Sequence, residues 1–177
     1  MSLLTWFAGG GDAEDDTLAS IENLKGSGLG DNLTGDDRGN RIDGLAGKDF
    51  LSGKGGNDKL FGGDETDFIF TGKGPDEVTG GGGADRFVLS DDENRRDVIK
   101  DFSRSEGDKI MLFGDPSGST FIGKGQFTGG EQVRFTVSGD KTIVEANFDG
   151  DLAADVQLEL SGKINLTAAD FFRNSLL

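Results

Sequence analysis

The chain has 177 residues, of which 33 are acidic and 18 basic, so its formal net charge is −15, and its hydrophobic share is 33%. It contains no cysteine and no histidine, which excludes disulfides, thiolate metal sites, a cysteine nucleophile and a histidine base. The acidity argues against nucleic acid and anionic membranes as partners, because both attract a positive surface. With 31 glycines and a thin core, the chain needs something to offset its charge before it can fold, and a bound multivalent cation is the obvious candidate.

The first part of the chain, residues 1–23, is acidic and weakly patterned, and we expect it to be a lead-in to the folded unit. The apolar run at 3–8 is too short for the core of a signal peptide and has no basic flank. No apolar run approaches the roughly 20 residues of a membrane-spanning helix. The sequence therefore predicts neither a cleaved N-terminal signal nor insertion into a membrane.

A nine-residue phrase then repeats seven times between residues 26 and 88, after a partial phrase that has Leu24 in its apolar place. Two successive phrases read GLAGKDFLS and GKGGNDKLF. The eighth place is always apolar, and the sixth place holds, in order, Asp31, Asn40, Asp49, Asp58, Asp67, Asp76 and Asp85. A flexible Gly/Asp-rich linker would not keep an apolar residue in register over seven phrases.

The phrase predicts an all-β fold, a parallel β-roll over residues 24–89. Its last three places form a strand too short to stand alone, so it must stack on copies of itself. Two phrases make one coil of 18 residues with a strand on each side and a turn at each end, and coils stack at the strand spacing of ~4.8 Å. The eighth-place side chains then meet in a narrow apolar seam.

The turns of the predicted roll are candidate calcium sites. Glycines allow backbone with positive φ that directs carbonyls toward one place, and the sixth-place side chains lie at the edge of each turn. Oxygen ligands without nitrogen or sulfur suit calcium, and the gaps between stacked turns give about five ions. With the sixth-place residues, the candidate ligands include the turn residues Gly44, Ala46, Gly53, Gly55, Gly62, Asp64, Gly80 and Gly82.

GLAGKDFLS, GKGGNDKLF and GGGGADRFV resemble the GGxGxDxUx nonapeptide of RTX (repeats-in-toxin) proteins. The segments ADRFVLSDDENRRDVIKDFSRSEGDKIMLF and DVQLELSGKINLTAADFF are similar to parts of the serralysin C-terminal domain and of alginate epimerase R-modules. The resemblance implies a secreted bacterial protein exported by a type I system that reads an uncleaved C-terminal signal, and folding on extracellular calcium. The chain is then either a small secreted protein by itself or, as we favour, the C-terminal part of a larger exoprotein, fused to a catalytic or adhesin region.

Some residues depart from the family pattern. Asn40 replaces the acid, and Leu29, Arg38 and Glu65 replace the fourth-place glycine, so we expect the first two phrases to bind calcium more weakly than residues 44–88. Thr71 replaces a first-place glycine. After the repeats, Asp97, Asp101 and Asp108 match the D-V-I-x-D-F…G-D-K-I pattern of the family; they either complete a terminal calcium site, with Asp101 and Asp108 as ligands, or make ordinary capping contacts.

Residues 90–177 predict a β-rich cap. VRFTV (133–137) and TIVEANF (142–148) predict a hairpin, 155–162 another strand, and Thr167 the N-cap of a short terminal helix. GSTFIGKG (118–125) lacks the Ser/Thr and the βαβ context of a phosphate-binding loop, so it predicts an ordinary loop. The acidic residues near Asn147 lack the terminal Glu of an EF-hand and predict a turn.

These features favour a non-enzymatic calcium-binding module that supports type I secretion. The alternative is a calcium-dependent binding module for an extracellular polysaccharide or a cell surface. A carboxylate-based enzyme is disfavoured, because the repeat already accounts for most of the carboxylates.

Overall fold

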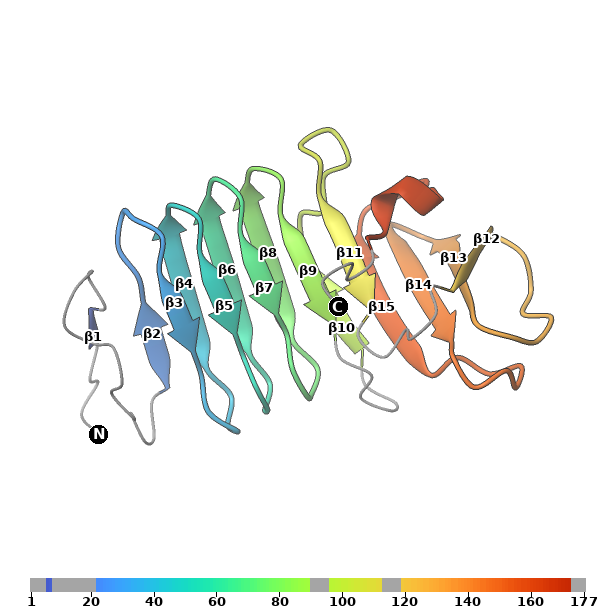
Figure 1. Cartoon of the computed structure of the whole chain (residues 1–177), viewed down its shortest axis with the longest axis horizontal. Coiled ribbons are helices and arrows are strands. Elements are labelled where there is room, and N and C mark those ends of the chain that lie inside the picture. Colours follow the sequence, from blue (N-terminus) through green and yellow to red (C-terminus); the bar gives the residue numbers. More distant parts are fainter. Residues whose placement is uncertain (1–5, 8–21, 90–95, 113–118, 173–177) are drawn as a thin grey trace.

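The computed structural model describes residues 6–7, 22–89, 96–112 and 119–172, and their strands form two sheets (Figure 1). Sheet A contains, in spatial order, β1 (Trp6–Phe7), β2 (Asn23–Lys25), β4 (Arg41–Ala46), β6 (Lys59–Asp64), β8 (Glu77–Gly82), β10 (Arg96–Ile99), β15 (Val156–Ser161), β14 (Lys141–Asn147), β13 (Gln132–Ser138) and β12 (Thr120–Gly123). Sheet B contains β3 (Asn32–Thr34), β5 (Phe50–Ser52), β7 (Phe68–Phe70), β9 (Arg86–Leu89) and β11 (Lys109–Leu112).

The strands of the repeats stack in parallel with a period of two phrases. Leu33 pairs with Leu51 and Leu51 with Ile69 in sheet B, each 18 residues further along the chain. Ile42 and Leu60 pair in the same way in sheet A. The predicted parallel β-roll, with alternate phrases on opposite sides, is confirmed.

The seam between the two sheets is formed by the eighth-place residues. Leu33 is 2% exposed and the other six are fully buried: Ile42, Leu51, Leu60, Ile69, Val78 and Phe87. Ile99 and Ile110 continue this seam beyond the repeats and are also fully buried. Full burial of such a side chain contributes about 1.5–3 kcal/mol, so this single column is the main apolar source of the roll's stability.

Positive φ angles occur at the second and fourth places of the central phrases. The fourth place is Gly47 (φ 110°) in one phrase and Gly56 (φ 118°) in the next, but the second place is taken by Leu45 (φ 81°) and Lys54 (φ 69°). Side chains are strained in this region, so stacking on neighbouring coils must hold these two turns in place.

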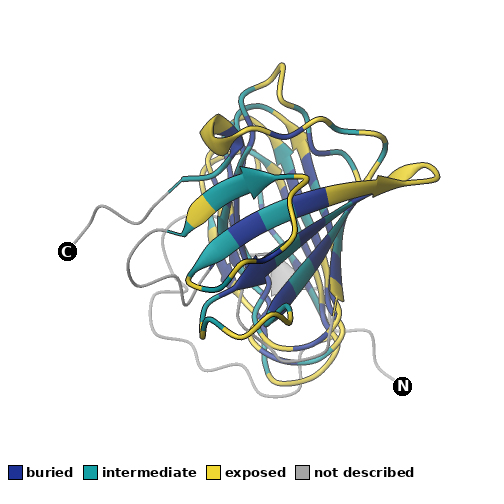
Figure 2. Ribbon diagram, turned by 90° about the vertical axis from the view of Figure 1, so that its right-hand side faces the viewer, coloured by how far each residue is buried: buried dark blue, intermediate teal, exposed yellow. Residues whose placement is uncertain are grey.

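Sheet A extends beyond the repeats without a break. β10 pairs in parallel with both β8 and β15, and β15, β14 and β13 follow as antiparallel neighbours. The predicted hairpin is confirmed, since β13 and β14 pair up to Ser138 and Lys141 across a two-residue turn. In Figure 2, buried residues alternate with more exposed ones along these strands.

The segment predicted as a loop at 118–125 includes a short edge strand, β12, which pairs with β13. That part of the prediction was wrong, because Phe121 packs against the core and its strand gains a partner in β13. The expected short terminal helix is present. It is a single 3₁₀ turn, Ala168–Asp170, with Thr167 as its N-cap.

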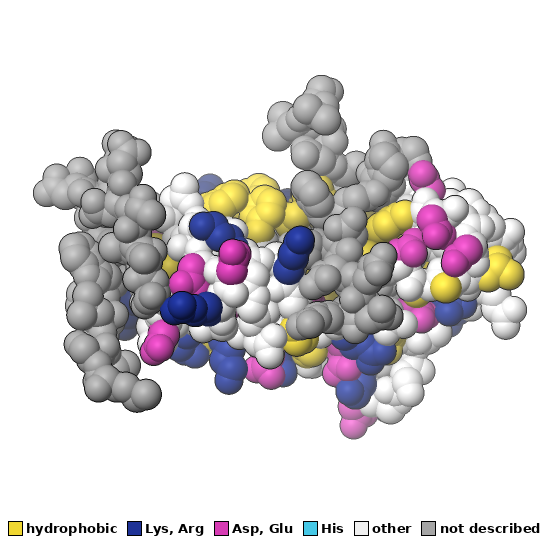
Figure 3. Space-filling view, turned by 90° about the horizontal axis from the view of Figure 1, so that it is seen from below, with side chains coloured by type: hydrophobic (Ala, Val, Ile, Leu, Met, Phe, Trp, Pro, Cys, Tyr) yellow, Lys and Arg dark blue, Asp and Glu magenta, His cyan; other side chains and the backbone are white. Residues whose placement is uncertain are grey.

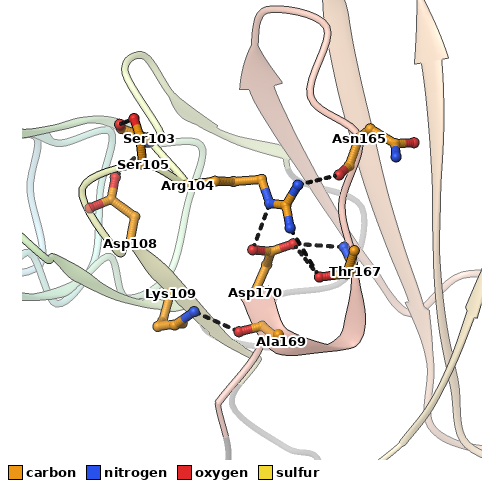
Figure 4. A network of polar contacts seen from close by, with 9 residues as sticks. All are labelled: Ser103, Arg104, Ser105, Asp108, Lys109, Asn165, Thr167, Ala169 and Asp170. Atoms are coloured by element: carbon orange, nitrogen blue, oxygen red, sulfur yellow. Dashed lines mark hydrogen bonds and ion pairs between the residues drawn. The ribbon is translucent and has the colours of Figure 1, made fainter.

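The last described residues close the end of sheet B. Phe171 forms a bridge with Ile110 in β11, and the N–H of Phe172 donates to the carbonyl of Ile110. A polar network holds the 3₁₀ turn against the β10–β11 connection (Figure 4). There Arg104 forms an ion pair with Asp170 over 2.8 Å and donates to the carbonyl of Asn165 and the hydroxyl of Thr167.

At the other end, Trp6 pairs in parallel with Leu24, again 18 residues later. Residues 8–21 of the expected lead-in lie outside the described part of the chain, so its boundary at residue 23 stays a prediction, as does the boundary at residue 89. Within the described residues no helix is long and apolar enough to span a membrane.

Candidate metal centre

The sixth-place side chains form two hydrogen-bonded ladders, one at each edge of the roll. In the first ladder, the N–H of Asp31 donates to Oδ1 of Asp49, that of Asp49 to Asp67, and that of Asp67 to Asp85, over 2.7–3.0 Å. In the second ladder, the N–H of Asn40 donates to Asp58 and that of Asp58 to Asp76. Each carboxylate therefore fixes the backbone of the coil before it.

The second oxygen of these carboxylates is buried without a donor. Oδ2 of Asp49, Asp58, Asp67 and Asp85 has no hydrogen-bond partner, and each residue is at most 2% exposed. An ionised oxygen in such a position is costly unless a positive charge or a donor reaches it. The described part of the roll provides neither, so these atoms are the strongest indication of cation sites.

The first-place glycines give these oxygens the space they occupy. A Cβ added to Gly44 would lie 2.3 Å from Oδ2 of Asp49 and 2.5 Å from the carbonyl oxygen of Gly62 in the next coil. Gly62 stands in the same relation to Asp67 and to the carbonyl of Gly80. A carboxylate oxygen and a carbonyl oxygen of successive coils therefore come together beside each of these glycines.

Burial raises the pKa of Asp58 to about 6, of Asp67 to about 7 and of Asp85 to about 6. The backbone N–H bonds act in the opposite direction, and neighbouring carboxylates add to the rise. The pKa of Asp49 and that of Asp108 are raised for the same main reason. Without a cation, these carboxyl groups keep their protons to a higher pH than ordinary aspartates do.

Backbone carbonyl oxygens lie close to the places that the buried carboxylates occupy. Within the described ranges, no three acidic side chains gather closely enough to hold a metal ion by themselves. The third-place candidates Ala46, Asp64 and Gly82 align across β4, β6 and β8, and Gly55 lies opposite Lys73 on the other edge. Carboxylate and carbonyl oxygens without nitrogen or sulfur form the donor set that calcium prefers, so the residues present fit calcium.

The first two phrases have a different turn. No residue of 26–43, all of which the structure describes, has a positive φ. Oδ2 of Asp31 accepts from the N–H and hydroxyl of Ser27, and Oδ1 of Asn40 accepts from the N–H of Asp36. These oxygens are already satisfied, which agrees with weaker binding at this end, a ranking that stays a prediction.

Of the three carboxylates after the repeats, Asp97 and Asp108 continue the ladders, and Asp101 binds the turn beside them. Oδ1 of Asp97 accepts from the N–H of Asp76, and Oδ1 of Asp108 from that of Asp85, both over 3.0 Å. Both oxygens of Asp101 accept backbone N–H groups, from Gly80 and Gly81. Capping contacts are therefore present at all three; whether Asp101 and Asp108 also bind calcium stays a prediction.

The acidic loop between β14 and β15 is a turn organised by Asn147, as predicted. The amide of Asn147 donates to the carbonyls of Asp151 and Ala153, and its oxygen accepts from Gly150. Oδ2 of Asp155 accepts the N–H of Phe148. The loop thus satisfies its own polar groups.

Two parallel sheets joined by Gly- and Asp-rich turns, with buried carboxylates facing turn carbonyls, define a calcium-binding β-roll. Residues 26–60 and 61–95 match the family model of the RTX calcium-binding nonapeptide repeat. This part of the chain is therefore an array of RTX repeats. The sequence predicts the sixth-place residues as ligands, and their role as ligands stays a prediction. It gave no sign of the ladder bonds, which join residues of different coils.

Among solved structures, the chain is similar to the solution structures of two subunits of the mannuronan C5-epimerase of Azotobacter vinelandii. AlgE6R3 is 26% identical over 85% of this chain and 82% of its own, with a TM-score of 0.49. AlgE6R2 is 29% identical over 90% of this chain and 97% of its own, with a TM-score of 0.45. A comparison with curated protein sequences gave no significant match.

Proposed function

We propose that the chain is a non-catalytic module of an extracellular bacterial protein that folds when calcium binds between its coils. The observation that carries this proposal is the set of buried Oδ2 atoms without donors on Asp49, Asp58, Asp67 and Asp85. Calcium, when bound, supplies the positive charge that these buried carboxylate oxygens lack. Because the unfolded chain has no such sites, binding energy then becomes folding energy.

Each part of a turn has its own role in the proposed sites. The sixth-place carboxylates of the central coils, Asp49 to Asp85, provide the charged ligands, and the first- and third-place carbonyls complete the oxygen set. Oδ1 of each of these carboxylates accepts a hydrogen bond from an N–H of the preceding coil. Oδ2 is therefore left to bind the ion. Four residues in the first ladder enclose three gaps and three in the second enclose two, in keeping with about five ions.

We further propose export by type I secretion machinery, followed by folding outside the cell. Low calcium would leave the chain unfolded for export, and millimolar calcium would drive it to the roll. The proposed signal lies at the C-terminus, whose Phe171 and Phe172 pack against β11 in the folded state. Secretion of a reporter fused ahead of this chain, with and without residues 164–177, would test this part.

Circular dichroism during a calcium titration tests the folding proposal. We expect a coil-like spectrum in chelator and a cooperative rise of β signal with calcium, while magnesium at equal concentration has little effect, because it demands stricter octahedral geometry. A spectrum that does not respond to calcium would contradict the proposal.

A second candidate function is binding of an extracellular polysaccharide, favoured by the outer face of sheet B. Phe50 and Phe68 are 40% and 44% exposed there, and the ring of Phe70 lies 4.7 Å from that of Phe50. The at least partly exposed outward positions of its strands contain no acid: Asn32, Thr34, Phe50, Ser52, Phe68, Phe70, Arg86, Lys109 and Met111. Hydrophobic side chains gather on the upper side of the roll in Figure 3.

Such a face suits sugar rings that stack on aromatic side chains, with Arg86 and Lys109 beside them. Neither cation forms an ion pair within the described residues; they donate to carbonyls of Gly107 and Ala169. Affinity electrophoresis in calcium with mannuronan or with neutral dextran tests this candidate. Phe50→Ala with Phe68→Ala should abolish any retardation, whereas Phe61→Ala, on sheet A beneath Arg41, should not. Equal migration of wild type with and without polymer would exclude it.

A further inference from the structure

Thr71 is the one first-place residue of the seven phrases that carries a side chain. Its backbone follows the repeat: the N–H of Thr71 donates to the carbonyl of Val88, as that of Gly53 donates to Phe70 in the coil before. It is fully buried. The position is therefore the same as that of the glycines, and its side chain enters a space that the glycines leave to the carboxylates.

The glycines reveal which group a side chain at this place faces. A Cβ on Gly53 would lie 2.3 Å from Oδ2 of Asp58, and one on Gly62 equally close to Asp67. In each case the neighbour is the sixth-place carboxylate of the same phrase. For Thr71, the corresponding carboxylate is that of Asp76, which is 1% exposed.

The hydroxyl of Thr71 has no hydrogen-bond partner in the described part of the chain. A buried hydroxyl left unsatisfied costs about 1–3 kcal/mol, and valine would have the same shape without that cost. A neutral oxygen beside a buried carboxylate, in a layer between coils, is a suitable ligand for a hard divalent cation.

We infer that the hydroxyl of Thr71 is an additional oxygen ligand for the cation held at the Asp76 end of the second ladder. The inference rests on the proposed calcium-binding function and adds a residue that the nonapeptide pattern does not contain. The last gap of this ladder then differs from the others, in that a side-chain hydroxyl joins the carboxylate and the carbonyls.

Calorimetric calcium titrations of Thr71→Val and Thr71→Ser test the inference. We expect Thr71→Val to bind about one ion fewer, or one ion about tenfold more weakly, a change of about 1.4 kcal/mol. Thr71→Ser keeps the hydroxyl and should bind as wild type does. Thr79→Val, at the ninth place of the same phrase, is the matched control and should change nothing. Terbium luminescence provides a second count of sites.

Thr71→Gly restores the residue of the other phrases and serves if Thr71→Val does not fold. It should keep this site but bind its ion more weakly than wild type does, because the hydroxyl is lost while the carboxylate and the carbonyls remain. If either variant folds and binds calcium with wild-type number and affinity, the inference is wrong, even if its stability in chelator has changed, because that change would reflect packing alone. If wild type itself binds no calcium, the proposed function fails instead.

Discussion

The N–H of Asp67 donates to Oδ1 of Asp85 over 3.0 Å, while Oδ2 of Asp85 is buried without a partner. One carboxylate thus joins two coils with one oxygen and leaves the other for a cation. This division explains why six of the seven sixth places hold a carboxylate and only one holds an amide, Asn40, since an amide offers one acceptor oxygen instead of two.

Replacing Asp67 by Ala should raise the calcium concentration at the folding midpoint by about tenfold, because it removes a charged ligand from the centre of a ladder. Asn40→Ala should shift the midpoint by less than about threefold, since the oxygen of Asn40 already accepts from Asp36. The measurement is the calcium titration followed by circular dichroism. Asp43→Asn, an exchange in a surface ion pair with Arg41, is the control. Equal shifts at Asp67 and Asn40 would contradict the ranking of sites.

Acid should partly replace calcium in stabilising the folded chain. The folded-state pKa values of Asp58, Asp67 and Asp85 lie at about 6–7, above the ordinary value of 3.8. The folded chain then binds more protons than the unfolded chain between about pH 4 and pH 7, so apo stability is present at low pH and lost as pH rises through this window. In chelator we expect more β signal at pH 5 than at pH 7.5.

Protons and calcium compete for the same oxygens. The calcium-induced rise in β signal should therefore be smaller at pH 5 than at pH 7.5, because protons already fold part of the chain at the lower pH. If the calcium-free chain loses β signal on acidification, protonation of the ladder carboxylates does not stabilise the fold, and this prediction is wrong.

Gly44→Ala should destabilise the calcium-bound roll by about 2 kcal/mol, because its Cβ would overlap Oδ2 of Asp49 and the carbonyl of Gly62. Gly28→Ala is the matched control: nothing lies within 4 Å of a Cβ at that position, so its effect should stay within about 0.5 kcal/mol. Urea unfolding in saturating calcium measures both. Similar losses from the two variants would exclude crowding at the first place as the cause.

Arg104→Ala should loosen the C-terminal segment. Although burial opposes it, the hydrogen bond from Arg104 holds the pKa of Asp170 below its usual range, and Asp170 would be left buried without its ion pair. We expect a loss of about 2 kcal/mol, less than for a fully buried pair because Arg104 is partly exposed. Hydrogen exchange at residues 164–172 measures it.

The exposed pair of Lys163 and Asp140 supplies the control, and Lys163→Ala should leave exchange unchanged. A double variant with Asp170→Asn should lose less than the sum of the single changes. Additive losses would indicate that the two residues act independently.

The nine-residue period predicts much of the roll, because each phrase repeats both an apolar residue and an acid in register. The strands, their parallel pairing and the buried seam follow from that pattern. It does not reveal which places take positive φ, since Leu45 and Lys54 occupy that backbone without being glycine; stacking on the next coil decides this.

The C-terminal part was less predictable. The pairing of β10 with β15 joins residues about 60 positions apart, and no local pattern encodes such a partner. For the candidate sites, the sequence indicates which residue types act as ligands and how they alternate between the two ladders. In the sequence, Thr71 is only an exception at a place that otherwise holds glycine, and nothing there shows that its hydroxyl is buried.

Every ladder bond runs in one direction along the chain. A coil is held by acceptors that come after it in the sequence, and for the last coil these are Asp97, Asp101 and Asp108. The two ends of the array are therefore not equivalent: the first coil of repeats has no earlier repeat coil that needs its acceptors, whereas the last coil needs acceptors from beyond the repeats. Shortening it from the N-terminal side removes whole layers and leaves the remaining acceptors in place. Shortening it from the C-terminal side leaves the last remaining coil without the carboxylates that accept its N–H groups.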